Sequence, residues 1–197
     1  PVSLIMLKAI RILLLLGLFT IASLAIGAQA SSPTIVVLSV EGVINPVSAD
    51  YISRGIEEAE DNNAVACIIQ MDTPGGLDIA MRDIIKDIVG ARVPVVVYVS
   101  PSGARAASAG VFITVAAHVA AMAPNTAIGA ASPVSVGPEG EQQISETMEE
   151  KILNDAAAYI RSIAESHERN VEWAEQAVRE AVSATEQEAL ELNVIDM

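Results

Sequence analysis

A serine with small neighbours is the first candidate for chemistry in this 197-residue sequence. Ser108 stands between two alanines in Gly103-Ala-Arg-Ala-Ala-Ser-Ala-Gly110, where a peptide would have room to lie across it. We expect it at or near a helix N-terminus, where the N–H of Ala109 and the helix dipole would stabilise an oxyanion formed by serine attack. The same eight residues, here called the octet, are also explained by a serine that caps a helix in a packing interface of small residues. Taken alone, the octet favours this structural interpretation.

A glycine pair in the segment Asp72-Thr-Pro-Gly75-Gly76 is the second candidate. It follows a predicted strand and precedes a predicted helix, so its N–H groups can approach a ligand closely near a helix start. One interpretation is half of an oxyanion hole, and the other is a tight turn between strand and helix. A substrate strand could also pair with an exposed edge here, a hypothesis that intact cleavage in Gly76→Pro would exclude.

A serine nucleophile needs a base, and beyond residue 30 the candidates are two lysines and two histidines. Lys86 lies on the polar face of a predicted helix among acidic residues, which keep an amine protonated. His118 opens a predicted short strand, a position that favours a structural role. His167 stands in Glu165-Ser-His-Glu168, a polar helix end that predicts a surface position.

Lys151 fits the role of the base better, because it borders the apolar stripe of a long predicted helix. That part of the stripe consists of Ile144, Met148 and Ile152. A lysine held beside the stripe would lose water, which favours the neutral amine that a base needs. We expect Glu149 and Glu150 to face water. An ordinary surface pairing of Lys151 with Asp155, four residues later, is the alternative.

Apolar runs and helical periodicities alternate through the rest of the sequence. The predicted strands are 34–40, 64–71, 93–99 and 118–122, and the predicted helices are 47–61, 77–90, 106–117 and 144–168, followed by two shorter acidic helices. This alternation implies an α/β fold with a mostly parallel sheet buried on both faces. Residues 125–143 are the one long irregular stretch. Because they join the serine region to the lysine helix, we predict a lid that limited proteolysis would cut first.

The first thirty residues predict a secretory signal peptide. Lys8 and Arg11 precede the apolar run 12–26, and Ala28-Gln-Ala30 forms a small-x-small cleavage signal. As a helix, the run would span about 22 Å, less than the ~30 Å hydrocarbon core of a bilayer. We therefore expect residues 1–30 to be removed, with an uncleaved anchor as the alternative, and residues 31–197 to form one exported domain.

The composition limits the possible partners and cofactors. The net charge is −14, which makes nucleic acid and anionic membranes poor partners. Aromatic residues make up only 3% of the chain, too few for the stacking platforms of single-stranded nucleic-acid binders. The single cysteine, Cys67, excludes an internal disulfide and a cysteine-based zinc site, and we predict neither a metal nor a cofactor.

In their order along the chain, these motifs resemble those of the NfeD-type membrane-bound serine peptidases. The resemblance spans about residues 34–196, and the segments that carry it are Gln70-Met71, Asp72-Thr-Pro-Gly-Gly, the octet around Ser108, Met122-Ala-Pro, Ile128-Gly-Ala and Lys151-Ile-Leu-Asn. These peptidases are similar to Clp protease subunits and share the crotonase-like fold. The resemblance therefore implies a buried, mostly parallel sheet with flanking helices in repeated ββα-type units.

The resemblance also implies a role for each candidate residue. Ser108 matches the family's nucleophile and Lys151 the general base of a Ser–Lys dyad, while Gly75 or Gly76 with Ala109 matches the oxyanion-hole amides. The family cuts apolar segments, notably near the C-terminus of stomatin-like membrane partners. This implies an apolar peptide substrate, a location at the extracytoplasmic or periplasmic face of the membrane, and a homodimer or larger assembly. Longer members continue into transmembrane helices and a further domain, so we expect a truncated member or a fragment.

Three functions remain open on the sequence. The leading one is a Ser–Lys endopeptidase outside the cytoplasm, which depends on Ser108 and Lys151. A non-catalytic module that holds a membrane-associated partner would need neither residue. An acyl-CoA enzyme of the crotonase type would need basic groups for the CoA phosphates, and the scarcity of lysine and arginine argues against it, as does the predicted signal peptide.

Overall fold

The computed structural model describes residues 3, 6–11, 13, 33–137, 140–141 and 145–197. The chain forms two units, Pro1–Pro33 and Thr34–Met197. In the first unit, residues 6–11 are helical, and the predicted cleavage signal at residues 28–30 lies outside the described residues. Among the described residues, no helix combines the length and the apolar character that crossing a bilayer requires.

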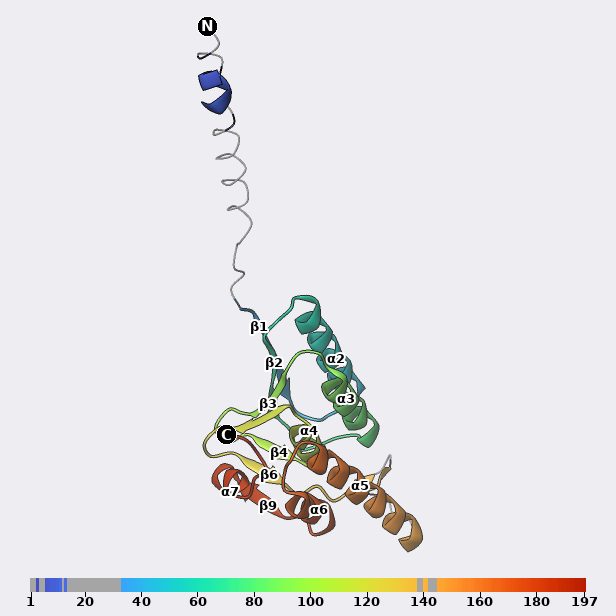
Figure 1. The fold of residues 1–197 in the computed structure, drawn as a ribbon. Coiled ribbons are helices and arrows are strands. Elements are labelled where there is room, and N and C mark those ends of the chain that lie inside the picture. The colour runs from blue at the N-terminus through green and yellow to red at the C-terminus, as the bar shows by residue number, and fades with distance from the viewer. Residues whose placement is uncertain (1–2, 4–5, 12, 14–32, 138–139, 142–144) are drawn as a thin grey trace. The chain divides into compact units, whose positions relative to one another are not determined.

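A four-stranded parallel sheet forms the centre of the second unit (Figure 1). Its strands, in their order across the sheet, are β1 (Ile35–Glu41), β2 (Ala66–Asp72), β3 (Val95–Val99) and β5 (Val119–Met122). Parallel neighbours need a crossover connection, and here α2 (Pro46–Asp61) and α3 (Asp78–Gly90) connect the first three strands. The four predicted strands and these two predicted helices are confirmed.

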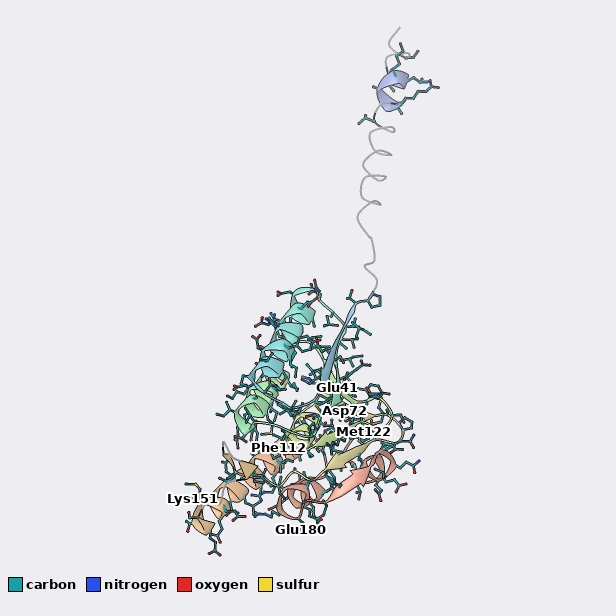
Figure 2. All side chains as sticks on the ribbon, turned by 180° about the vertical axis from the view of Figure 1, so that it is seen from behind. Glu41, Asp72, Phe112, Met122, Lys151 and Glu180 are labelled. Carbon is teal, nitrogen blue, oxygen red and sulfur yellow. The ribbon has the colours of Figure 1, made fainter. Side chains whose placement is uncertain are left out.

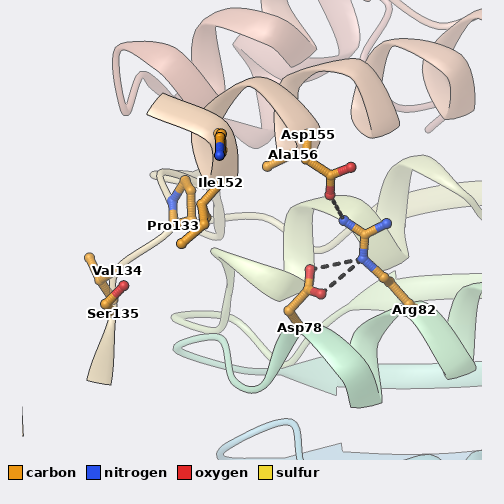
Figure 3. A pocket seen from close by; sticks show the side chains of 9 residues that line it. Asp78, Arg82, Pro133, Val134, Ser135, Ile152, Asp155 and Ala156 are labelled. Carbon is orange, nitrogen blue, oxygen red and sulfur yellow. Dashed lines mark hydrogen bonds and ion pairs between the residues drawn. The ribbon is translucent and has the colours of Figure 1, made fainter. Parts of the chain in front are cut away.

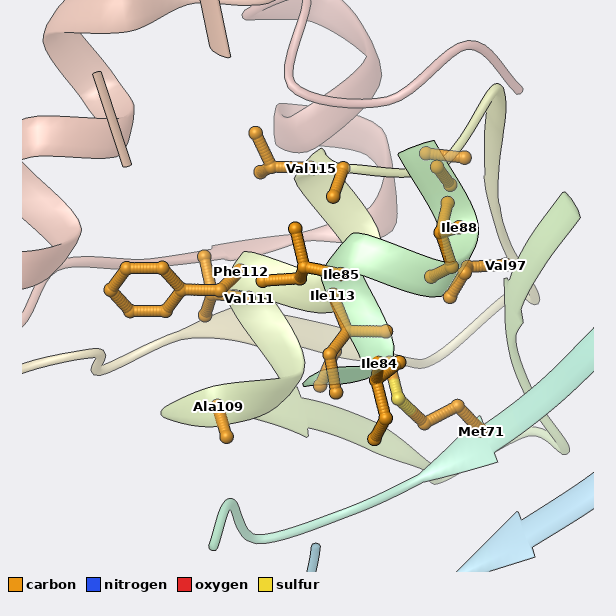
Figure 4. Packing of buried hydrophobic residues seen from close by; sticks show 14 of the residues in the cluster. Met71, Ile84, Ile85, Ile88, Val97, Ala109, Val111, Phe112, Ile113 and Val115 are labelled. Carbon is orange, nitrogen blue, oxygen red and sulfur yellow. The ribbon is translucent and has the colours of Figure 1, made fainter. Parts of the chain in front are cut away.

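The core lies between the inner face of this sheet and the helices (Figure 4). Side chains alternate along β2, so Cys67, Ile69 and Met71 all point inward and are fully buried. α2 comes close to β1 because Gly55 lies directly against Leu38. The buried residues of α3 are Ala80, Met81, Ile84, Ile85 and Ile88. Leu77, which the periodicity places on the same apolar face, instead precedes the helix and is 56% exposed.

The outer face of the sheet is open to solvent along β1, so the predicted burial on both faces does not hold for this strand, whereas β5 is buried on both faces. Ile35 and Val37 point to this face and are 50% and 53% exposed. Ile68, the register partner of Val37 on β2, is only half-buried. Helices α2 and α3 lie together on the other side of the sheet (Figure 1), so the apolar run in β1 is covered on one face only.

A smaller sheet stands next to the end of β2 and positions Ser108. Its strands are β4 (Arg105–Ala107), β6 (Ala127–Gly129) and β9 (Ser183–Thr185). A parallel bridge between Thr73 and Ala106 joins it to the segment after β2. Because residues 105–107 pair as a strand, the helix predicted from Ala106 begins three residues later, as α4 (Ala109–Val115). Ser108 is therefore the one residue between β4 and α4.

The last third of the chain is mainly helical. After the short strands β7 (Val136–Gly137) and β8 (Gly140–Glu141) come α5 (Glu146–Ser166), α6 (Val171–Arg179) and α7 (Glu186–Glu191). The second half of α5 buries its apolar stripe, as predicted. The first half projects in Figure 1, where Met148 is 47% and Ile152 is 37% exposed. Ile144, the first predicted member of the stripe, lies outside the described residues.

Candidate active site

Ser108 has a backbone conformation that non-glycine residues rarely adopt. Its φ is 53° and its ψ is −115°, between a strand and a helix. Its N–H donates to the carbonyl of Gly129 at 3.2 Å, and its own carbonyl accepts from the N–H of Val111 at 3.0 Å. Both neighbouring elements thus hold the turn in place. A serine on a sharp, strained turn from strand to helix is the arrangement in which hydrolases expose a nucleophilic hydroxyl.

The glycine segment lies directly against this serine. A β-carbon on Gly75 would be 2.5 Å from Ser108 Cβ and 3.0 Å from Ser108 Oγ, and Gly75 has a φ of +114°. Thr73, which is fully buried, fixes the segment because its Oγ1 accepts from the Gly75 N–H at 3.0 Å and donates to the Gly75 carbonyl at 3.2 Å. Both the conformation and the close approach require glycine at position 75.

The backbone amides around Ser108 differ in whether they are free to bind an anion. The Gly75 N–H is occupied by Thr73 Oγ1. The N–H groups of Gly76 and Ala109 have no acceptor within the described part of the chain. Ala109 is the first residue of α4, where orphan amides and the helix dipole both favour negative charge. Of the two predicted glycine amides, that of Gly76 is therefore the one without an acceptor among the described residues.

Lys151 lies on the first half of α5 and is exposed, so the expected desolvation is not found. It lines a pocket of about 490 Å³ together with residues of α3 and of segment 133–135. Figure 2 places Lys151 at the projecting end of the helix, where too few neighbours exist to exclude water. Among the described residues, no hydrogen bond joins Lys151 to Ser108.

Arg82 of α3, which the sequence analysis did not single out, is the central charge of this pocket (Figure 3). Arg82 Nε donates to both carboxylate oxygens of Asp78, at 3.0 and 2.9 Å, and Arg82 Nη2 donates to Asp155 at 2.5 Å. Its guanidinium lies 4.3 Å from the ring centroid of Tyr159. The predicted alternative pairing of Lys151 with Asp155 is therefore replaced by an ion pair between α3 and α5. The spacing of Asp78 and Arg82 suits an ion pair within the helix, but no local pattern reveals the contact with Asp155.

The other candidate bases have structural partners. Lys86 donates to Asp83 at 2.9 Å, and this hydrogen bond and the aspartate charge raise the pKa of Lys86. His118 Nδ1 accepts from the N–H of Val95 at 3.1 Å, at the opposite end of the parallel strands from Ser108. Burial lowers the pKa of His118, and the charge of His167 acts in the same direction. The contact with Val95 supports the structural role predicted for His118, but the residue is exposed and does not belong to the core.

Comparisons with known proteins agree with the fold and with the order of the motifs. Residues 34–196 match the family described as NfeD1b, N-terminal domain. The chain is 42% identical over 161 residues to the membrane-bound protease PH1510 of Pyrococcus horikoshii. It is 32% identical over 145 residues to the membrane protein NfeD1b of Bacillus subtilis. These matches cover 82% and 73% of this chain but 36% and 32% of the relatives, so the chain spans about a third of their length.

Solved structures of one protease are similar over most of the chain. Two variants of the 1510-N membrane-bound stomatin-specific protease match with a TM-score of 0.78 at 38% identity. One has a serine replaced by alanine. The other has a lysine replaced by alanine and holds a substrate peptide. The matches cover 84% of this chain and 79% and 75% of those chains, and they confirm the predicted Clp-like α/β fold. The chain belongs to the NfeD1b N-terminal domain family.

Proposed function

We propose that the chain is a serine endopeptidase domain that cleaves apolar peptide segments with a dyad of Ser108 and Lys151. The observation that carries the proposal is the strained turn at Ser108, with the unpaired amides of Gly76 and Ala109 beside it in the described structure. The similarity to proteins named membrane-bound protease and stomatin-specific protease supports the same function.

The proposed reaction begins with attack of Ser108 Oγ on the carbonyl carbon of the scissile bond. The neutral amine of Lys151 takes the hydroxyl proton, and the N–H groups of Gly76 and Ala109 bind the oxyanion. The tetrahedral intermediate collapses, and the Lys151 ammonium returns the proton to the departing amine. Water then hydrolyses the acyl-enzyme by the same route. Because catalytic hydrogen bonds often tighten only in the substrate complex, we propose that substrate binding brings α5 and Lys151 to the serine.

Exposed apolar side chains near these residues fit an apolar substrate. Leu77 and Ile79 follow the glycine pair and are 56% and 76% exposed. Val134 and Ile152 line the pocket of Lys151 and are 66% and 37% exposed. Burying such side chains against an apolar peptide removes apolar surface from water, which favours binding. A segment of a stomatin-like membrane protein is the proposed substrate, because the protease 1510-N is described as stomatin-specific.

The proposed site of action is the extracytoplasmic face of the membrane. We propose that residues 1–30 direct export and that residues 31–197 act there as a homodimer or larger assembly. The positive charges and apolar run at the start of the sequence support export, and the membrane-bound relatives support action near a membrane. The proposed mechanism uses no metal or cofactor.

The experiment that tests this function is hydrolysis of β-casein and of apolar peptides by the 197-residue chain. Ser108→Ala and Lys151→Ala should each abolish cleavage while the circular dichroism spectrum stays that of the parent. Lys86→Ala is the matched control, because Lys86 is an exposed lysine that forms an ion pair with Asp83 of its own helix. It should leave cleavage within about twofold of the parent, as surface substitutions usually do.

Two results would overturn the proposal. No cleavage by the folded parent chain, alone or with a stomatin-like partner, would favour the non-catalytic binding module. Cleavage that Ser108→Ala abolishes and Lys151→Ala leaves intact would keep the nucleophile but reject the lysine as its base.

A further inference from the structure

Arg82 joins two helices, α3 and α5, around the pocket of Lys151. It donates to Asp78 within α3 and to Asp155 of α5, and its guanidinium stacks over Tyr159, one turn further along α5. The ring of Tyr159 in turn stacks on Phe112 of α4 at a centroid distance of 6.2 Å. Phe112 lies on α4, four residues after Ser108. Through Tyr159, Arg82 is therefore connected both to α5, which carries Lys151, and to α4, which follows Ser108.

Asp155 is the acidic residue of α5 that is best placed to form an ion pair with Lys151 if it has no other partner. The two side chains are four residues apart on α5 and therefore share one face of the helix. A carboxylate four residues away on the same helix face stabilises an ammonium ion and disfavours the neutral amine. In the structure this carboxylate is instead bound to Arg82, at 2.5 Å.

We infer that Arg82 is a positioning residue for the proposed base: by engaging Asp155 it prevents that carboxylate from pairing with Lys151. The inference rests on the proposed function, because only a base needs to lose its proton. Arg82 acts in two ways in the same direction. It occupies the competing carboxylate, and its own positive charge in the same pocket disfavours a second cation.

The charges that face Lys151 allow a quantitative comparison between variants. In the pocket they are Arg82 and Asp78 from α3 and Asp155 from α5, while segment 133–135 contributes no charge. Glu149 and Glu150, the sequence neighbours of Lys151, are exposed and do not line the pocket. Arg82→Gln makes the pocket one unit more negative. Asp155→Asn makes it one unit more positive. The double substitution restores the charge of the parent.

The test is a titration of Lys151 itself, followed by NMR of the 197-residue chain with ¹³C-labelled lysine. The sequence contains only three lysines, Lys8, Lys86 and Lys151, so each resonance can be assigned by substitution. In Arg82→Gln, the pH at which Lys151 loses its proton should rise by about half a unit or more. Asp155→Asn in that background should bring it back, and Asp155→Asn alone should lower it. Lys86 also lies four residues from Arg82 on α3, so only a shift of Lys151 that Asp155→Asn reverses supports the inference.

Cleavage gives the second readout. The acidic limb of the pH–rate profile should move to higher pH in Arg82→Gln and return in the double variant. Arg82→Lys should show a smaller displacement, because lysine keeps the positive charge but lacks the planar guanidinium group. An unchanged Lys151 titration in Arg82→Gln, or no return in the double variant, overturns the inference. The titration does not depend on activity. A chain that cleaves nothing would therefore contradict the proposed function, while the titration would still test the coupling between Arg82, Asp155 and Lys151.

Discussion

Gly75 and Ser108 are in contact so close that no side chain can exist at position 75. A β-carbon there would lie 2.5 Å from Ser108 Cβ, and rotation about the serine χ1 cannot move that atom away. The contact couples the glycine segment after β2 to the strained turn before α4. The two parts of the candidate active site are therefore positioned by each other as well as by their own strands.

Gly75→Ala should disrupt the site through this contact. Its φ of +114° adds backbone strain of roughly 1–2 kcal/mol to the clash. Gly103→Ala is the matched control, because Gly103 has a φ of +92° but nothing within 4 Å of the new β-carbon. Urea unfolding should show a larger loss for Gly75→Ala, and cleavage should fall about tenfold or more only in that variant. Equal stabilities and equal cleavage would refute the steric argument.

The backbone strain at Ser108 predicts that glycine at this position stabilises the chain relative to alanine. Ser108→Gly and Ser108→Ala both remove the hydroxyl, but only glycine relieves a φ of 53° with a ψ of −115°. The glycine variant should be more stable than the alanine variant by about 1 kcal/mol in urea unfolding. Ala158→Gly, at an exposed position of α5, should change stability in the opposite sense by about 1 kcal/mol. A less stable Ser108→Gly would mean that the turn is not strained.

The sequence predicted the elements that have a clear period and missed those that lack one. Helices α2 and α3 follow from apolar residues at helical spacing, and the parallel strands from β-branched runs. The strand at residues 105–107 consists of an arginine and two alanines and has no period, so it merged with the predicted helix that follows. The open outer face was missed because an uncovered strand and a covered one can carry the same apolar run.

The site was predicted less completely than the fold. The octet and the glycine pair predict Ser108 and nearby amides as the candidate site, since small residues and glycines at strand ends leave a local signal. The position of Lys151 depends on how far α5 extends beyond its neighbours, which periodicity does not report. The contact between Arg82 and Asp155 joins residues 73 positions apart, and only the folded chain brings them together.

His118 predicts a pH dependence of stability. Burial lowers its pKa below the ordinary value of 6.5, so the folded chain favours the neutral ring, whose Nδ1 accepts from the Val95 N–H. The unfolded chain takes up the proton first as the pH falls. The contribution of His118 is therefore present above about pH 6.5 and is lost as the pH falls toward the folded-state value.

His118→Gln tests this sign, because glutamine keeps an acceptor and does not titrate. The free energy of unfolding of the parent, measured by urea between about pH 7.5 and pH 5, should fall more steeply than that of the variant. Cleavage should persist in His118→Gln, because the residue lies at the far end of the parallel strands. If the free energies of unfolding of parent and variant depended on pH in the same way, His118 would not be the group that titrates. If a folded His118→Gln variant lost cleavage, His118 would again be a candidate for the base.

The buried contacts of Arg169 predict a large loss of stability on its substitution, outside the candidate site. Its side chain is 4% exposed, and its guanidinium donates to the carbonyls of Val115, Ala117 and Val194 and to Asp196. These bonds join the end of α4 to the C-terminal segment beside β5. Arg169→Met fills the space but leaves three buried carbonyls without a donor, so we expect a loss of about 3–5 kcal/mol in urea unfolding.

Asp196→Asn is the matched comparison for the same network. Its carboxylate is 45% exposed, and an amide oxygen can still accept from Arg169 and from the Ala120 N–H. We expect a loss of only about 1 kcal/mol, because the three carbonyl contacts of the guanidinium remain. If the two variants lost equal stability, the ion pair and not the carbonyl contacts would hold the C-terminal segment. We expect the larger loss in Arg169→Met because the carbonyls of Val115, Ala117 and Val194 belong to residues that are at most 1% exposed. Without the guanidinium, these buried acceptors would lose their donor and could not be hydrated.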